Sequence, residues 1–152
     1  MTPIPLEKEA LFPRMDGMQK NIKKLEKLSR LSFQDFCKED NYDLAQHHLR
    51  LALEGVFNIS SHILSRLPGG RAVAYKDMAV KMGECGVIPK DFVNRALIPM
   101  AGMRNVLVHH YAEMEAKRLY EIVCNHREDI ETFLKHIRDF LQNLKSFQLE
   151  MS

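Results

Sequence analysis

The chain has 152 residues, a formal net charge of +2, 45% apolar residues and 28% charged residues. This balance is typical of a globular protein, and we expect residues 1–152 to form one domain with a core over about 12–144. No apolar run approaches the ~20 residues that a membrane helix needs. The small net charge excludes an extended basic surface, so any basic surface for nucleic acid must be local.

The cysteines and the first residues of the chain indicate a cytoplasmic protein. Cys37, Cys85 and Cys124 are odd in number and no two have CxxC spacing, so neither a disulfide framework nor a zinc site is predicted. The segment Met1–Glu7 has no basic region followed by an apolar run, which argues against a signal peptide. A reducing cytoplasm agrees with both observations.

Apolar residues recur every three or four positions along the N-terminal half, which predicts helices. The first helix is expected over 14–30, and a short helix opens at Ser32, where Asp35 completes a weak capping box. A long helix is expected over 40–67 and ends before Pro68-Gly69-Gly70. Its apolar positions cover more than one stripe, which suggests one face in the core and another against a second subunit.

Three further helices are expected in the C-terminal half: 75–85, about 90–109 and 115–144. Pro99 should kink or restart the middle one, because proline removes a hydrogen bond of the helix. Asn125-His126 marks a candidate break in the last helix, and the tail 148–152 is expected to fray. The predicted fold is all-α, an antiparallel bundle of four long helical segments plus one or two short helices.

Polar side chains gather at the end of the helix predicted over 90–109, in the run Arg104-Asn105-Val106-Leu107-Val108-His109-His110-Tyr111. Arginine has a permanent charge and planar donors that suit phosphate, and histidine titrates near neutral pH. Cleavage of RNA by its own 2′-hydroxyl needs a proton acceptor, a proton donor and a group that stabilises the phosphorane, but no metal ion. Arg104 and His109 are therefore candidate catalytic residues.

The spacing of this run points to a site shared by two chains. At about 100° per residue, His109 lies about 140° around a straight helix from Arg104, so the two do not converge. Arg104 and Tyr111 are seven residues apart and are expected to share a face. A two-fold dimer would bring two copies of the run to one cleft, with two arginines and two histidines around one phosphate.

The run resembles the Arg-x4-His-x-Tyr pattern of the HEPN domain family, in the form found in HepT toxins of HEPN–MNT toxin–antitoxin pairs. The matching residues are Arg104, Asn105, His109 and Tyr111. The helix around Asn41–His62 and the order of the helices are also similar, and the likeness covers about 12–144. The chain departs from the family at Asn58, where an acidic residue is frequent.

The resemblance implies a toxin that works as a homodimer, with a composite RNA-cleaving site at the interface and no cofactor. It also implies a nucleotidyltransferase antitoxin of the MNT type, which silences the toxin by attaching AMP to Tyr111. We expect His109 to be the general acid or base and Arg104 to bind the scissile phosphate, leaving a 2′,3′-cyclic phosphate on the product. Asn105 is expected to orient His109 or the RNA, and Glu54 to pair with Arg104 and fix its rotamer.

Two other functions agree with the same residues. One is a non-catalytic helical module that binds a nucleotide or a nucleotidyltransferase, and the other is a structural helical dimer without a substrate. In the first case the run would be a docking site, and in the second Arg104 would pair with a carboxylate such as Glu54 or Glu113 and hold helices together. His47, His48 and His62 are a weaker candidate metal site, because their spacing matches no recognised set of ligands.

Overall fold

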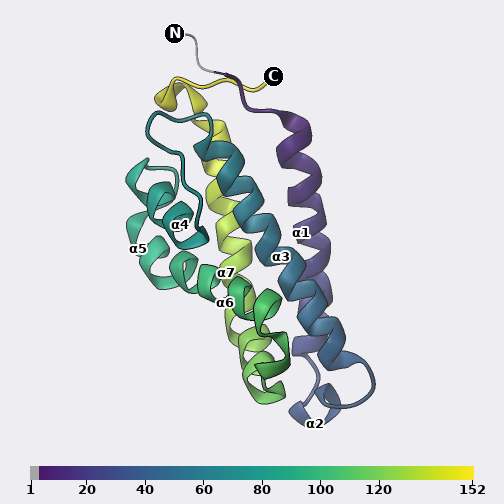
Figure 1. Ribbon diagram of the computed structural model, residues 1–152. Coiled ribbons are helices and arrows are strands. Elements are labelled where there is room, and N and C mark those ends of the chain that lie inside the picture. The colour runs from purple at the N-terminus through teal and green to yellow at the C-terminus, as the bar shows by residue number, and fades with distance from the viewer. Residues whose placement is uncertain (1–3) are drawn as a thin grey trace.

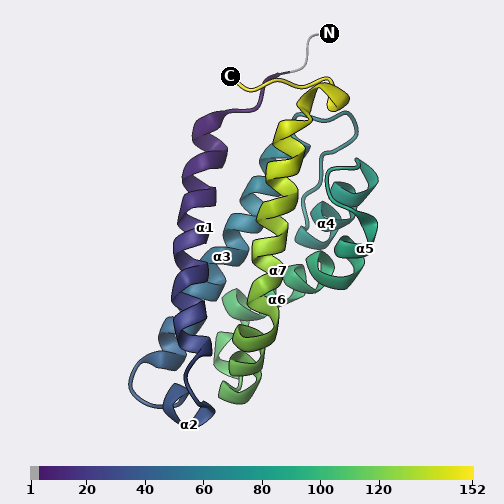
Figure 2. The ribbon, with the colours of Figure 1, turned by 180° about the vertical axis from the view of Figure 1, so that it is seen from behind.

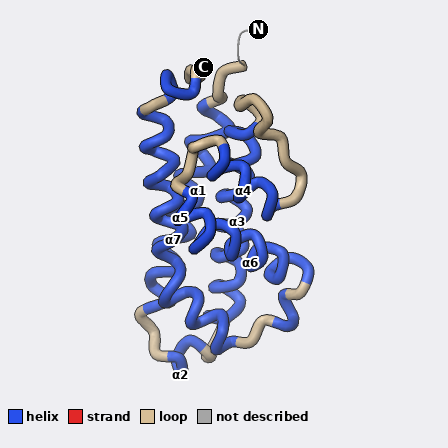
Figure 3. Tube along the Cα trace, turned by 90° about the vertical axis from the view of Figure 1, so that its left-hand side faces the viewer, coloured by secondary structure: helices blue, strands red, loops and turns tan. Residues whose placement is uncertain are grey.

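The computed structural model describes residues 4–152, and most of them are helical, with no β-strand in this part of the chain (Figure 3). Residues 1–3 lie outside the described part of the chain. They belong to the segment Met1–Glu7, which was predicted not to be a signal peptide. Three long helices lie side by side: α1 (Lys8–Ser29), α3 (Asn41–Leu64) and α7 (Ala116–Gln142). The short helix α2 (Phe33–Phe36) links α1 to α3.

The other side of α3 is covered by α4 (Tyr75–Glu84) and α6 (Ile98–His109), and the short helix α5 (Lys90–Phe92) lies between these two in the chain. In Figure 1, α1 descends, α3 rises, the segment from α4 to α6 descends and α7 rises. Figure 2 shows α7 from behind, between α1 and this segment. The predicted all-α antiparallel bundle is therefore confirmed.

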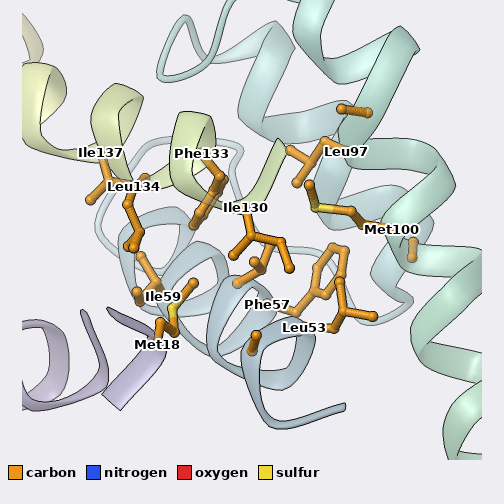
Figure 4. Packing of buried hydrophobic residues seen from close by; sticks show 14 of the residues in the cluster. Met18, Leu53, Phe57, Ile59, Leu97, Met100, Ile130, Phe133, Leu134 and Ile137 are labelled. Carbon is orange, nitrogen blue, oxygen red and sulfur yellow. The ribbon is translucent and has the colours of Figure 1, made fainter. Parts of the chain in front are cut away.

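Helix α3 lies at the centre of the buried cluster, and this position explains its broad apolar surface. Figure 4 shows Ile59 beside Met18 of α1, while Leu53 and Phe57 face Met100 of α6. The second apolar stripe of α3 is thus covered by the chain's own α4 and α6. The second apolar face, which was predicted to pack against another subunit, is therefore accounted for within one chain.

The first helix begins at Lys8, earlier than the predicted start at residue 14, and it contains Pro13. Proline has no N–H to bond the carbonyl of Glu9, so one helical hydrogen bond is missing there. Leu11 is fully buried in the core. Burial of such a side chain contributes about 1.5–3 kcal/mol, which offsets the missing bond and keeps the helix continuous.

The predicted kink at Pro99 takes the form of a π-helical turn, Val93–Leu97, between α5 and α6. The N–H of Ile98 donates to the carbonyl of Val93, one residue further back than in an α-helix. Pro99 follows at the start of α6 and has no N–H to restore the regular pattern. Proline and the π turn together separate α5 from α6.

Two predictions for the C-terminal end are wrong. Helix α7 continues through Asn125-His126, because both side chains are exposed and leave the buried stripe uninterrupted. The tail expected to fray is held in place, since Leu149 is buried and the Leu6 N–H donates to the carbonyl of Glu150 at 2.9 Å. The Ser152 N–H donates to the carbonyl of Leu6 at 2.9 Å, so the buried cluster extends beyond 12–144 at both ends.

Two general properties complete the description. Cys37, Cys85 and Cys124 are free thiols. Within residues 4–152, no helix combines the length and the apolar character that crossing a membrane requires.

A network of polar contacts joins the N-terminal segment to the end of α3. There, the Glu7 N–H donates to Nε2 of His62 at 3.1 Å, and Nε of Arg66 donates to the carbonyl of Pro5 at 3.2 Å.

The contact between Glu7 and His62 predicts that the fold becomes less stable as the pH falls below 6.5, the ordinary pKa of histidine. The bond needs an unprotonated Nε2. Burial lowers the pKa of His62, and the Arg66 and Arg14 cations lower it further against the opposing effect of Glu7. The unfolded chain therefore binds this proton more readily, and the free energy of unfolding rises with pH just below 6.5.

Urea unfolding between about pH 5 and pH 8 measures this dependence. His62→Gln is the matched variant, because its side-chain oxygen can accept the same N–H and does not titrate. Burial also lowers the pKa of His48 and His136, and both remain in the variant. The difference between wild type and variant in the slope of the unfolding free energy against pH therefore isolates His62. Equal slopes for the two proteins would contradict the prediction.

Candidate active site at the end of helix α6

The Arg104–Tyr111 run spans the end of α6 and the turn after it. His109 is the last helical residue, and His110 leaves the helical conformation at φ −135° and ψ 31°. Tyr111 then begins a short 3-10 turn, Tyr111–Glu113. The prediction that Arg104 and Tyr111 share a helix face is therefore wrong, because α6 ends two residues before Tyr111.

One face of α6 is open to solvent and carries two of the predicted site residues. The exposed positions are Pro99, Gly102, Asn105 and His109. They are three or four residues apart, so they form a single stripe along the helix. Asn105 and His109 are neighbours on this stripe, one turn apart. The side chain of Tyr111 is also solvent-accessible, at 62% of its full exposure.

Arg104 lies on a different side of α6 and is half-buried. Its Cζ is 4.3 Å from the centroid of the Tyr75 ring, and its buried Nε has no hydrogen-bond partner within the described part of the chain. Such a contact between a cation and an aromatic ring contributes about 0.5–2 kcal/mol, depending on how well water is excluded. In residues 4–152, no carboxylate forms an ion pair with Arg104, so its charge is not neutralised.

The expected pair between Glu54 and Arg104 is wrong. Oε1 of Glu54 instead accepts from Nη1 of Arg50, one turn earlier on α3, at 3.1 Å. Residues four apart on a helix are neighbours, so this contact forms without any change in the backbone. The other proposed partner, Glu113, lies 3.8 Å from Nδ1 of His110.

A groove of about 420 Å³ lies between α3 and α6 beside this run. Its lining residues come from both helices and the turn: Asp43, Gln46, His47, Arg50, Leu107, Val108 and Tyr111. Nε2 of Gln46 donates to the carbonyl of Tyr111 at 3.1 Å, and the Tyr42 hydroxyl donates to the carbonyl of Met114. Helix α3 thus fixes the turn that presents Tyr111.

Four residues of this region were not predicted from the sequence: Tyr42, Gln46, Arg50 and Tyr75. Tyr42 and Gln46 are four residues apart, so the sequence indicates that they share a helix face. It does not indicate that they bind the turn after α6. Tyr75 comes from the start of a different helix and gave no signal. These contacts depend on how α3, α4 and α6 pack, which periodicity within one helix does not determine.

The histidines proposed as a weaker metal site do not converge. Nδ1 of His48 lies 3.1 Å from Oδ1 of Asn21, whereas His62 accepts from the Glu7 backbone. His47 contacts the edge of the His48 ring and lines the groove. The part of the chain that the structure describes has no group of three His, Cys, Asp or Glu side chains placed to hold a metal ion.

Residues 18–137 match the family model described as Ribonuclease HepT-like. A tRNA nuclease HepT from Aphanizomenon flos-aquae (strain 2012/KM1/D3) is 20% identical over 141 residues, which is 92% of this chain and 95% of that protein. An mRNA nuclease HepT from Shewanella oneidensis is 28% identical over 105 residues, which is 69% of this chain and 76% of that protein.

Among solved structures, the tri-AMPylated Shewanella oneidensis HEPN toxin in complex with MNT antitoxin superimposes with a TM-score of 0.77 at 21% identity. The alignment covers 87% of this chain and 98% of that toxin. At this identity the likeness concerns the fold, whereas the family match spans most of the sequence. The chain therefore belongs to the family of HepT-like ribonucleases.

Proposed function

We propose that this protein is the toxin of a HEPN–MNT toxin–antitoxin pair and that it cleaves RNA internally without a metal ion. Relatives named tRNA nuclease and mRNA nuclease HepT support the activity. A HEPN toxin solved with an MNT antitoxin supports the partner. The observation that carries the proposal is the exposed stripe with Asn105 and His109, on the same helix as an arginine that no carboxylate neutralises.

The proposed reaction uses the 2′-hydroxyl of the RNA as the nucleophile. The 2′-oxygen attacks phosphorus, the bond from phosphorus to the 5′-oxygen breaks, and the products carry a 2′,3′-cyclic phosphate and a 5′-hydroxyl. One proton leaves the 2′-hydroxyl and another is delivered to the 5′-oxygen. His109 exchanges these protons, Arg104 stabilises the charge on the phosphorane, and Asn105 orients His109 or the RNA backbone.

A homodimer interface is the proposed place for this chemistry. The reaction needs a base and an acid together, and each chain contributes one His109. Within one chain, His109 lies on the solvent-exposed stripe while Arg104 turns toward Tyr75. A two-fold axis beside α6 would place two copies of the run around one phosphate. Each chain then supplies half of a site.

Silencing is proposed to occur at Tyr111. Its side chain is exposed at the edge of the groove between α3 and α6, within reach of an external transferase. Transfer of AMP joins the tyrosine oxygen to the α-phosphorus of a nucleoside triphosphate, ATP, and releases pyrophosphate. The added phosphate would compete with RNA for the arginines of the composite site. The solved relative described as tri-AMPylated supports this mode of control.

Incubation of purified protein with RNA in the presence of EDTA tests the proposed activity. Wild type should cut the RNA and leave 2′,3′-cyclic phosphate ends, identified by mass spectrometry of the fragments. Arg104→Ala should slow cleavage by about 10²–10³-fold, because a donor to the developing charge is lost. Arg30→Ala is the matched control, since Arg30 is exposed at the C-cap of α1 and pairs with Glu26 at 2.6 Å.

Intact RNA after incubation with wild type, or cleavage that appears only when a divalent metal is restored, would contradict the proposal. Binding of RNA or of a nucleotidyltransferase without cleavage would identify the alternative function, a non-catalytic binding module. A protein that neither binds nor cleaves would match the structural dimer. Size-exclusion chromatography with light scattering, run on the same samples, measures the homodimer directly.

A further inference from the structure

The guanidinium of Arg104 is held by an aromatic ring from another helix. Arg104 belongs to α6 and Tyr75 is the first residue of α4. The two side chains meet with Cζ 4.3 Å from the ring centroid. Among residues 4–152 the buried Nε of Arg104 has no hydrogen-bond partner, so polar contacts with them at that atom do not fix the side chain.

The Tyr75 ring is itself fixed by the core. Its centroid is 5.2 Å from that of Phe57 on α3, with the planes tilted by 54°. Phe57 is 1% exposed and lies among the residues buried between the helices. Phe57, Tyr75 and Arg104 therefore form a row of contacting side chains from α3, α4 and α6, anchored in the core by Phe57.

An aromatic ring and a carboxylate position an arginine in different ways. A carboxylate occupies the in-plane N–H donors and cancels the positive charge, as Glu54 does for Arg50. A ring attracts the flat face of the guanidinium and leaves the donors at its edge available. Arginine bound in this manner keeps its charge, and because Nε of Arg104 is buried, the donors left for a phosphate are those on Nη1 and Nη2.

We propose that Tyr75 is a positioning residue, whose ring holds Arg104 ready for the RNA phosphate without neutralising it. The inference rests on the proposed function, in which Arg104 stabilises the phosphorane. Tyr75 does not touch the substrate in this proposal and acts through Arg104 alone. It follows that the ring of Tyr75 matters for cleavage, whereas its hydroxyl does not.

Tyr75→Leu and Tyr75→Phe are the paired variants that test the role of the ring. The leucine variant should lower the single-turnover cleavage rate by about 10–100-fold, because a misplaced catalytic group loses its orientation. The phenylalanine variant keeps a ring face and should restore most of the rate. Tyr120→Leu is the control, because Tyr120 is a half-buried tyrosine on α7 whose ring packs on Phe33 and Phe36 instead.

A double-mutant cycle separates positioning from a general structural effect. If Tyr75 acts only through Arg104, Tyr75→Leu should cause no further loss in a chain that already carries Arg104→Ala. If the loss of cleavage rate in the double variant is the product of the losses in the two single variants, the proposal is overturned. Circular dichroism shows whether each variant folds. Tyr75→Met is the second variant if the leucine form does not, because its flexible side chain fills space without presenting a ring.

Nuclear magnetic resonance observes the contact between Arg104 and Tyr75 without any need for cleavage. In ¹⁵N-labelled protein, the Nε–H signal of Arg104 should be shifted upfield by the ring current of Tyr75, and Arg104→Lys identifies it. The shift should persist in Tyr75→Phe and vanish in Tyr75→Leu or Tyr75→Met. A signal unchanged in the variants without a ring overturns the inference. If wild type leaves RNA intact, the proposed function is overturned. In that case the Nε–H signal of Arg104 still shows whether the Tyr75 ring holds the arginine.

Discussion

Replacing His109 with alanine should lower the rate of RNA cleavage by about 10²–10⁴-fold, the usual contribution of a general acid or base. His109 is exposed on α6, so its removal leaves no buried cavity and the fold should be unchanged. Single-turnover cleavage in EDTA, with circular dichroism on the same samples, measures both properties. His110→Ala is the matched control, because His110 is the next residue, is also exposed and lies 3.8 Å from Glu113.

Mixed dimers sharpen this prediction, because they distinguish a shared site from two separate ones. Co-expression of wild type and His109→Ala in equal amounts should give about one quarter wild-type dimers and one half mixed dimers. If both copies of His109 serve one phosphate, only the wild-type dimers are active, and the activity falls to about one quarter. Independent sites would leave about one half, and that result would refute the composite site while keeping His109 catalytic.

Tyr111→Phe should abolish attachment of AMP when the protein is co-expressed with an MNT-type nucleotidyltransferase. The transferase must reach the hydroxyl, and Tyr111 is the exposed tyrosine, whereas Tyr42, Tyr75 and Tyr120 are half-buried. Intact-mass spectrometry reads the number of AMP units on each chain. Tyr120→Phe is the control and should carry the same mass as modified wild type, because its hydroxyl donates to the carbonyl of Leu31 inside the fold.

The modified and unmodified forms should also differ in activity. Wild type carrying AMP should no longer cleave RNA, because the added phosphate competes for the arginines of the composite site. Tyr111→Phe should cleave RNA even after co-expression with the transferase. AMP retained on the phenylalanine variant would place the modification on another residue, and full cleavage by modified wild type would separate modification from silencing.

The sequence predicted the helices and the family because both depend on local patterns. Apolar spacing of three and four residues marks α1, α3 and α7, and the Arg104–Tyr111 run carried the resemblance that the family match confirms. The capping of α2 by Ser32 was also predicted, and the Ser32 side chain accepts from the Asp35 N–H at 3.1 Å. Each of these features is determined within a few residues.

The parts that the sequence did not predict depend on contacts between helices. Tyr111 lies in the turn that follows the end of α6. Gln46 of α3 fixes this turn by donating to the carbonyl of Tyr111. Glu54 was expected to pair with Arg104 of another helix, but it pairs with Arg50, four residues earlier on its own helix. The tail after Leu149 is held because the backbone of Leu6, far away in sequence, bonds to Glu150 and Ser152. Periodicity along one helix contains none of this information.

The π-helical turn at Val93–Leu97 has a consequence for how the site can vary. A π turn adds one residue to a helix, and one residue corresponds to a rotation of about 100°. The turn therefore sets the angular phase of α6 independently of α5. Loss of that extra residue would rotate Asn105 and His109 away from solvent and Arg104 away from Tyr75, with every side chain of the run intact. The rotational position of α6, in addition to the identity of its side chains, therefore determines which residues can form the site.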